Sequence, residues 1–388
     1  MKKNLIIFFY LFVMAFSCRE AYVSPVDTPA LGYLVVEGFI NTAGPTSFTL
    51  SRVNKFSRSE PIYEKGALVQ VEAENNVIFK LVEKDKGLYI SDSLLLNTAQ
   101  KYRLRIKTSD NKEYLSDFGT GKKTPVIDSI SWKRENEGVQ IYINAHDDLN
   151  ATKYYRWEFV QTWEIHTVFL PDIKLDQRTM GGQTIYSVSF LNPLTLEQDT
   201  SKFRCWVNKP STNILLGSSA KLSKDFIHLP IHFIGPGARE LSVLYSILVR
   251  QYAVTPEAYA FHEKMKKNTE LTGSIFDAQP SQLIGNIKCI SHPGEPVVGF
   301  VSVSSMEEKR IFIRNSEVPG WPYNSGCFTR TVENLSDSIK KKAIDSSLVP
   351  ALSAEVSSSG HIVDFLAAPA DCVDCTFVGK KDRPVFWP

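Results

Sequence analysis

The sequence predicts an all-β protein made of two immunoglobulin- or fibronectin-like β-sandwich modules, the second enlarged and carrying one inserted α-helix. Three observations predict this fold class: short runs in which apolar and polar residues alternate, turn-forming residues between the runs, and one stretch with helical periodicity. The chain has 388 residues, more than a typical single domain, and 43% of them are hydrophobic. That length and composition favour two domains with cores of their own.

The first module is predicted over residues 31–123. Its strands are expected in four short β-type runs, at residues 34–40, 47–53, 67–73 and 101–107. Asn75–Asn76 and Ser109–Lys112 supply turns between them. Thr124–Pro125 then predicts a hinge at the module boundary.

The second module is predicted over residues 124–388 and opens with strands at 127–132, 139–143 and 154–159. Its helix is expected at about 256–270, because Thr255 is a good N-cap residue and Pro256 suits the first helical position. Residues 171–202 match no pattern. Residues 315–360 are polar and rich in serine, which favours loop with a short helix near 336–343.

The first residues have the pattern of a secretory signal peptide. Two lysines are followed by an apolar run from Leu5 to Phe16 and by the pair Ser17–Cys18. The run is shorter than the roughly 20 apolar residues that a membrane-spanning helix needs. We therefore expect residues 1–17 to be a lipoprotein signal peptide, Cys18 to be lipidated, and residues 18–30 to form a lipidated tether.

The charge of the chain argues against nucleic acid as a partner. The sequence has 44 Lys and Arg and 42 Asp and Glu residues. Removing residues 1–17, which contain two lysines and no acid, leaves equal numbers of basic and acidic side chains. Nucleic acids and anionic membrane surfaces both require a basic surface, so neither is expected as the main partner.

Because exported proteins can keep disulfides, we expect the cysteines of this chain to form one or two of them. Cys372 and Cys375 could bridge each other, or one of them could reach Cys327. With Cys18 lipidated, five cysteines remain, so at least one thiol stays free. The Cys372-x-x-Cys375 spacing also occurs in redox and zinc sites, but no βαβ pattern and no second such pair accompanies it.

No motif predicts a metal, a cofactor or a catalytic set. His228 and His232 flank Pro230, which excludes a helix interior, and on a strand they lie about 13 Å apart. His262–Glu263 begins a zinc-protease motif that lacks its second histidine, so a solvated helix face is expected there. The nucleophile elbow G-x-S-x-G does not occur in the sequence.

The candidate binding loop follows the helix. Its polar residues lie in a segment with glycine and proline, and loops on a rigid β scaffold often carry binding residues. Trp321, in a stretch expected to be an exposed loop, is the aromatic candidate. The candidate residues of this site are Asp277, Gln279, Ser281, Gln282 and Trp321.

Several short sequence segments, taken together, resemble those of one family, the domain-of-unknown-function 4249 family of Bacteroidota lipoproteins. They are Ser17–Cys18 and residues 34–38, 245–252, 257–259, 267–270, 273–282, 285–287, 309–313 and 371–376. The resemblance covers nearly the whole mature chain. It implies an outer-membrane lipoprotein, of a kind often encoded beside TonB-dependent receptors. It offers no catalytic residues to carry over.

We therefore expect a non-catalytic lipoprotein of the outer membrane, anchored by lipid and exposed at the cell surface. Its expected partner is an outer-membrane β-barrel protein, such as a TonB-dependent receptor, to which it would be an accessory subunit. The alternatives are a stand-alone binder of extracellular glycans or peptides and, third, a hydrolase with an unfamiliar site.

Overall fold

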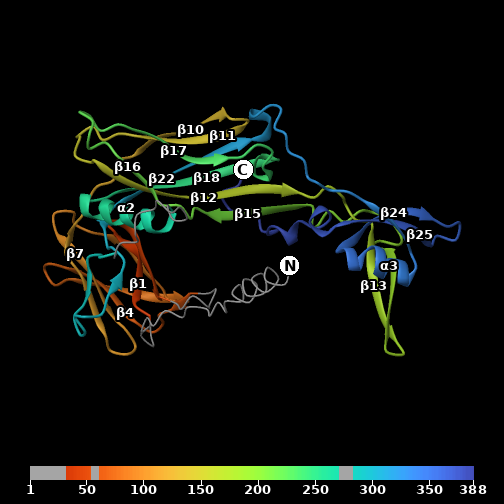
Figure 1. The fold of residues 1–388 in the computed structure, drawn as a ribbon, viewed down its shortest axis with the longest axis horizontal. Helices are drawn as coiled ribbons and strands as arrows, with labels where there is room; N and C mark the ends of the chain where they lie inside the picture. Colours follow the sequence, from red (N-terminus) through yellow and green to blue (C-terminus); the bar gives the residue numbers. More distant parts are fainter. Residues whose placement is uncertain (1–31, 54–60, 271–282) are drawn as a thin grey trace, which may run out of the picture.

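The computed structural model describes residues 32–53, 61–270 and 283–388. Within these ranges the chain is mostly β, as the sequence predicts, and has two α-helices. Neither helix has the length and apolar character that crossing a membrane requires. The elements form three modules. The N-terminal and central modules lie beside each other toward one end of the molecule, and the distal module lies at the other end (Figure 1).

The N-terminal module contains strands from two separate parts of the chain. They are β1 (Leu34–Asn41), β2 (Ala43–Arg52), β3 (Ile62–Tyr63), β4 (Leu68–Ala73), β5 (Ile78–Asp85), β6 (Leu88–Leu95), β7 (Lys101–Lys107), β8 (Glu113–Ser116), β9 (Gly119–Thr120), β19 (Ile287–Cys289), β20 (Val297–Val298) and β21 (Val303–Ser304). The main path of hydrogen-bonded strands runs β19-β8-β7-β4-β5-β6-β2-β1-β20.

The three late strands of this module differ from the predicted division of the chain, which placed residues 285–304 in the second module. β19 pairs antiparallel with β8, whereas β20 and β21 pair parallel with β1. Their side chains Ile287, Val297 and Val303 are buried in the same core as Leu34 and Phe48. Pairing between strands so distant in sequence leaves no local pattern, so the sequence did not reveal it.

The central module has two sheets that share one core. Its elements are β10 (Ile127–Glu135), β11 (Gly138–Ala145), β12 (Tyr154–His166), β15 (Arg204–Pro210), β16 (Leu215–Ser218), β17 (Ile227–Ile234), β18 (Leu244–Ala253), α2 (Pro256–Glu270) and β22 (Met306–Arg314). One sheet has the order β10-β11-β17, and the other has β15-β12-β18-β22 with β16 beside β12. Helix α2 occupies the range that the sequence predicts, and the Thr255 hydroxyl accepts a hydrogen bond from the Ala258 amide.

The distal module contains the stretch that matched no sequence pattern. Its elements are β13 (Ile173–Met180), β14 (Gln183–Phe190), β23 (Arg330–Glu333), α3 (Ser336–Lys342), β24 (Leu348–Val356) and β25 (Ile362–Pro369). Strands β13 and β14 form a hairpin that projects from the molecule (Figure 1). Gly181 and Gly182 form its turn with φ of 57° and 79°, a conformation that favours glycine. Ile173 and Val188 pack the hairpin onto the β23-β25-β24 sheet.

Candidate binding cleft

A cleft of about 540 Å³ lies between the N-terminal and central modules. It is lined by β1 and the segment around Phe300 on one side and by β12, β18 and α2 on the other. A second hollow of about 420 Å³ continues it along the central sheet. We call the two together the module cleft. Six residues line both hollows: Glu37, Arg156, Glu158, Arg250, His262 and Met265.

The alternation of the central strands places charged side chains on the cleft side. In β12, Tyr155 and Trp157 are buried in the core, while Arg156 and Glu158 point the other way. The register then pairs Glu158 with Arg250 of β18. The same register pairs Arg250 with Glu308 of β22, so acids and bases alternate across three strands.

The arginines of the cleft are paired with carboxylates. Arg156 Nη1 lies 2.7 Å from Glu158 Oε1, and Arg250 Nε lies 2.6 Å from Glu308 Oε1. The Tyr252 hydroxyl donates to Glu158 Oε2 at 3.1 Å. Burial, and then the charge of Glu158, raise the pKa of Tyr252, so its hydroxyl keeps its proton and remains a donor. These bonds hold the charged side chains in place on the face of the central sheet that lines the cleft.

His262 differs from the solvated helix face that the sequence predicts. Glu263 is exposed, but His262 faces the module cleft and is largely shielded from water. Burial, followed by the nearby charge of Arg156, lowers the pKa of His262 to about 3. Its Nδ1 is buried and has no hydrogen-bond partner among the described residues. At neutral pH this side of the cleft therefore carries an uncharged imidazole.

The sequence-predicted binding loop is not brought into this site by any described contact. Asp277, Gln279, Ser281 and Gln282 lie outside the described residues. Trp321 is described, and it lies away from the residues that line the cleft. Its ring packs against the core of the central module, and its Nε1 donates to the Ala238 carbonyl at 2.9 Å. Trp321 is therefore a packing residue rather than an exposed aromatic platform.

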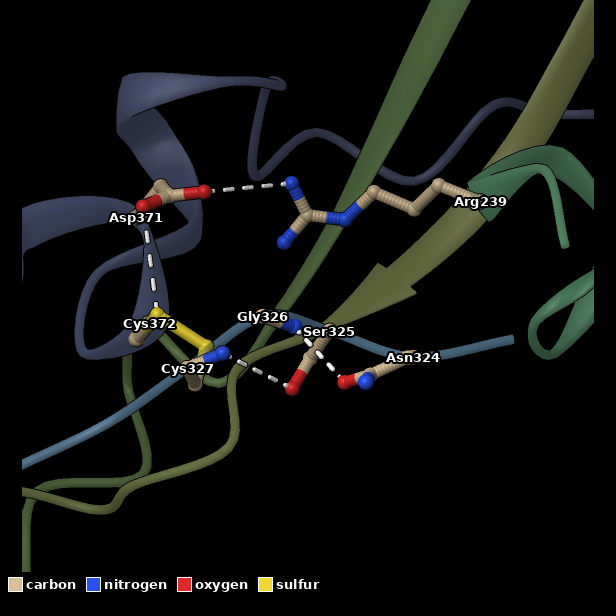
Figure 2. The surroundings of a disulfide bond; sticks show 7 residues. All are labelled: Arg239, Asn324, Ser325, Gly326, Cys327, Asp371 and Cys372. Atoms are coloured by element: carbon tan, nitrogen blue, oxygen red, sulfur yellow. Dashed lines mark hydrogen bonds and ion pairs between the residues drawn. A yellow bond between two sulfur atoms is a disulfide. The ribbon is translucent and has the colours of Figure 1, made fainter.

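The cysteines form two disulfides where the distal module joins the central one. Cys327 pairs with Cys372, one of the pairings the sequence left open, and Figure 2 shows this bridge beside Asp371 and Arg239. A Cys372–Cys375 bridge is wrong, because Cys375 pairs with Cys205, a partner that sequence reasoning missed. Cys205 is 170 residues away, so no spacing pattern relates the two. Cys289 is a buried free thiol, and Cys18 lies outside the described residues.

The two histidines of β17 have separate environments. His228 stacks on Tyr142 and shares a 2.6 Å hydrogen bond with Asn144, whereas burial lowers the pKa of His232 to about 4. In the part of the chain that the structure describes, no cluster of three or more His, Cys, Asp or Glu residues is arranged to hold a metal ion.

Sequence reasoning missed the cleft residues Arg156, Glu158 and Arg250. The available signal was the period-two pattern, which places Arg156 and Glu158 on one face of a strand. Charged residues on such a strand face usually point into solvent, so the pattern does not indicate a binding site. This face becomes the wall of a cleft because β12 lies in one sheet with β18 and β22 and because the N-terminal module packs beside that sheet.

Three solved structures show a distant likeness to this chain. A DUF4785 family protein from Legionella pneumophila is 9% identical, with a TM-score of 0.19 over 56% of this chain and 51% of that one. This chain thus spans about half the length of that protein. A chain from a structure of Gaeumannomyces graminis manganese lipoxygenase and Komagataella pastoris zonadhesin is 9% identical, with a TM-score of 0.16, over 58% of this chain and 90% of that one.

A chitinase from Bacillus thuringiensis is 10% identical, with a TM-score of 0.12 over 48% of this chain and 29% of that one. TM-scores of this size carry no inference about fold or function. No curated protein matches the chain.

A family model gives the informative match. The model of a domain of unknown function, DUF4249, matches residues 19–310. That range covers the whole N-terminal module and nearly all of the central one, including every residue of the module cleft. Since the match extends over well more than half of the sequence, the chain belongs to the DUF4249 family.

Proposed function

We propose that the protein is a non-catalytic, lipid-anchored lipoprotein of the Bacteroidota outer membrane, exposed at the cell surface. In this proposal it is an accessory, partner-binding subunit of a TonB-dependent receptor or of another outer-membrane protein complex. The signal pattern ending at Ser17–Cys18 supports the anchor. The disulfides Cys205–Cys375 and Cys327–Cys372 support export, because such bonds persist in oxidising compartments.

The observation that carries the proposal is the position of the modules. The first strand begins at Leu34 in the N-terminal module, and the distal module lies at the other end of the molecule (Figure 1). A lipid on Cys18 would therefore hold the N-terminal module nearest the membrane. The distal module and the module cleft would then be presented to a neighbouring protein.

The test is an affinity pull-down of the tagged, lipidated protein from gently solubilised outer membranes, with mass spectrometry of what co-purifies. We expect a β-barrel protein in stoichiometric amount. Recovery of the lipoprotein alone would contradict the accessory role. The Cys18→Ser variant is the matched control, and we expect it to leave the membrane fraction and to lose the barrel protein.

The second candidate function, a stand-alone binder of an extracellular glycan or peptide, is favoured by one observation, the module cleft itself. Its two hollows are large enough for a small ligand. Direct binding of such a ligand by protein purified without any barrel would favour this candidate over the accessory role.

The finer description of the fold is also part of the proposal. We propose that the N-terminal and central modules are immunoglobulin- or fibronectin-like sandwiches. The mainly antiparallel pairing of their strands and the core shared by the two central sheets support this assignment. An experimental structure whose strand connections do not follow a Greek key would contradict it.

A further inference from the structure

We propose that the module cleft binds an extended polypeptide segment of a partner protein, in which a basic side chain stands next to an apolar one. The inference rests on the proposed partner-binding function and adds the chemistry that the partner must present. Four features of the cleft lead to it: the engaged aromatic rings, the flexible apolar wall, the unpaired acid and the unused donors of the arginines.

The aromatic rings of the cleft are engaged with each other and not arranged as a platform. Phe39 meets Tyr252 edge-on, with ring centroids 4.8 Å apart, and the guanidinium of Arg156 covers Tyr252 at 4.7 Å. Phe261 and Phe300 pack together at 5.6 Å. Sugar rings commonly stack on a free aromatic face, and these engaged rings do not offer one. The cleft therefore favours a polypeptide over a carbohydrate.

The apolar part of the wall is flexible. The structure describes three methionines, and two of them, Met265 of α2 and Met306 of β22, line the cleft. Methionine is unbranched and polarisable, and it adapts to apolar side chains of different shape. Both methionines line the cleft together with Tyr252, which pairs with Met306 in the strand register and is almost completely buried. This wall suits an inserted aliphatic or aromatic side chain.

The charges of the cleft favour a basic side chain beside that apolar one. Both arginines are already paired, Arg156 with Glu158 and Arg250 with Glu308. Glu37 lines both hollows from the N-terminal module, is exposed, and forms no ion pair within the described residues. Glu308 lies beside the cleft rather than in its lining, and with it the five groups carry a net charge of −1. An incoming Lys or Arg side chain would therefore find a carboxylate free to pair.

The unused donors of Arg250 and the uncharged imidazole of His262 complete the site. A guanidinium has five N–H donors, and among the described residues the side chain of Arg250 uses one of them, toward Glu308. The remaining donors suit the carbonyl groups of an extended backbone. His262 adds no positive charge at neutral pH, because burial keeps its pKa far below 7. It therefore does not repel a basic side chain.

The probe is a library of random heptapeptides displayed on phage, selected on the full mature protein. We expect enrichment of peptides with a Lys or Arg beside an apolar residue. Fluorescence anisotropy of the best synthetic peptide then measures Kd. We expect Glu37→Lys to weaken binding about tenfold or more and Met265→Ala to weaken it about fivefold. Glu197→Lys, an exposed charge reversal in the distal module, should leave Kd unchanged.

A charge swap makes the assignment specific. Changing the basic residue of the peptide to Glu should weaken binding to the wild-type protein. The same peptide should recover affinity, to within about threefold of the original, on the Glu37→Lys variant. Thermal unfolding of each variant at the wild-type temperature shows that the fold is intact. Failure of the swap to restore binding overturns the inference.

Two further results would overturn the inference and still leave the proposed function intact. One is that no peptide is enriched while the barrel protein still co-purifies equally with wild type and Glu37→Lys. The other is that an oligosaccharide array binds in a way that Glu37→Lys abolishes, with no peptide binding. Conversely, peptide binding that is lost in Glu37→Lys supports the cleft even where no barrel co-purifies, and then only the accessory role fails.

Discussion

Thr124 and Ser305 connect two of the chain segments that pass between the N-terminal and central modules. The Thr124 amide donates to Ser305 Oγ at 2.9 Å, and the Thr124 hydroxyl donates to the Ser305 carbonyl at 2.5 Å. The same hydroxyl accepts from the Ala253 amide at 3.0 Å. Thr124 is buried, so the segment Thr124–Pro125, which the sequence suggests as a hinge, is fixed at this point. These bonds join the two modules next to Ser304 and Met306, which line the module cleft.

The first prediction concerns this junction. Thr124→Val keeps the shape of the side chain but removes its hydroxyl, and it leaves the Ser305 carbonyl and the Ala253 amide without that partner. We expect the free energy of unfolding to fall by about 1–3 kcal/mol, the usual cost of buried polar groups left unpaired. Urea unfolding followed by circular dichroism measures it. Thr179→Val, at an exposed position of β13, is the control and should change stability by less than about 0.5 kcal/mol.

The second prediction concerns the disulfide at the junction of the distal and central modules. Removing the Cys327–Cys372 bridge in a Cys327→Ala, Cys372→Ala double variant should lower the free energy of unfolding by about 2–5 kcal/mol. The reason is that the bridge closes a loop and so restricts the conformations of the unfolded chain. We expect the loss to appear as earlier unfolding of the distal module, measured by hydrogen exchange of residues 330–369. Equal loss of protection throughout the N-terminal module would contradict this assignment.

Peptide mapping under non-reducing conditions provides an independent check of the pairing. We expect the linked peptides Cys205–Cys375 and Cys327–Cys372, and a thiol on Cys289 that reacts with a maleimide only after unfolding. A peptide in which Cys372 is linked to Cys375 would refute the pairing.

The sequence predicts an element correctly where the residues that determine it are close together in the chain. Thr255 and Pro256 locate the start of α2 because a capping side chain and a missing backbone donor act within one helical turn. The hairpin β13–β14 was not predicted because most of its side chains are exposed. Its sequence therefore lacks the alternation of apolar and polar residues by which strands are recognised. Only Ile173 and Val188 are buried, and they pack against strands more than 140 residues away.

The candidate site could not be predicted for a related reason. Arg156 and Arg250 are ordinary charged residues on strand faces, and neither carries a motif. They share a cleft with Glu37 because β12 pairs with β18 and because the N-terminal module packs beside them. These relationships join residues roughly 100 to 200 positions apart, and local sequence patterns do not record contacts over such separations.

The third prediction concerns Trp387. Its Nε1 donates to the buried carboxylate of Glu164 at 2.9 Å, and its ring packs edge-on against Trp206 and Phe312. Trp387→Ala should cost about 3–5 kcal/mol, because it opens a large cavity and removes a donor from a buried acid. Thermal unfolding measures the loss. Val385→Ala, at a fully exposed position two residues away, should have almost no effect.

The fourth prediction concerns the pH dependence of stability. Burial and then Arg156 lower the pKa of His262 to about 3 in the folded protein, whereas an unfolded histidine titrates near 6.5. Between these values the unfolded chain binds a proton that the folded protein does not, so stability must fall as the pH falls through this window. From His262 alone we expect a loss of about 2 kcal/mol between pH 6.5 and pH 5, since one pKa unit corresponds to about 1.4 kcal/mol.

His262→Gln removes this titration. The difference in unfolding free energy between the variant and the wild type should therefore move in favour of the variant by about 2 kcal/mol as the pH is lowered from 7 to 5. The lowered pKa of His232 acts in the same direction, but it is present in both proteins and cancels in the difference. Met265→Leu, which changes the same helix face without a titrating group, should show a difference that does not vary with pH. A constant difference for His262→Gln would mean that the imidazole is as easily protonated in the folded protein as in the unfolded chain, and hence that water reaches it in the cleft.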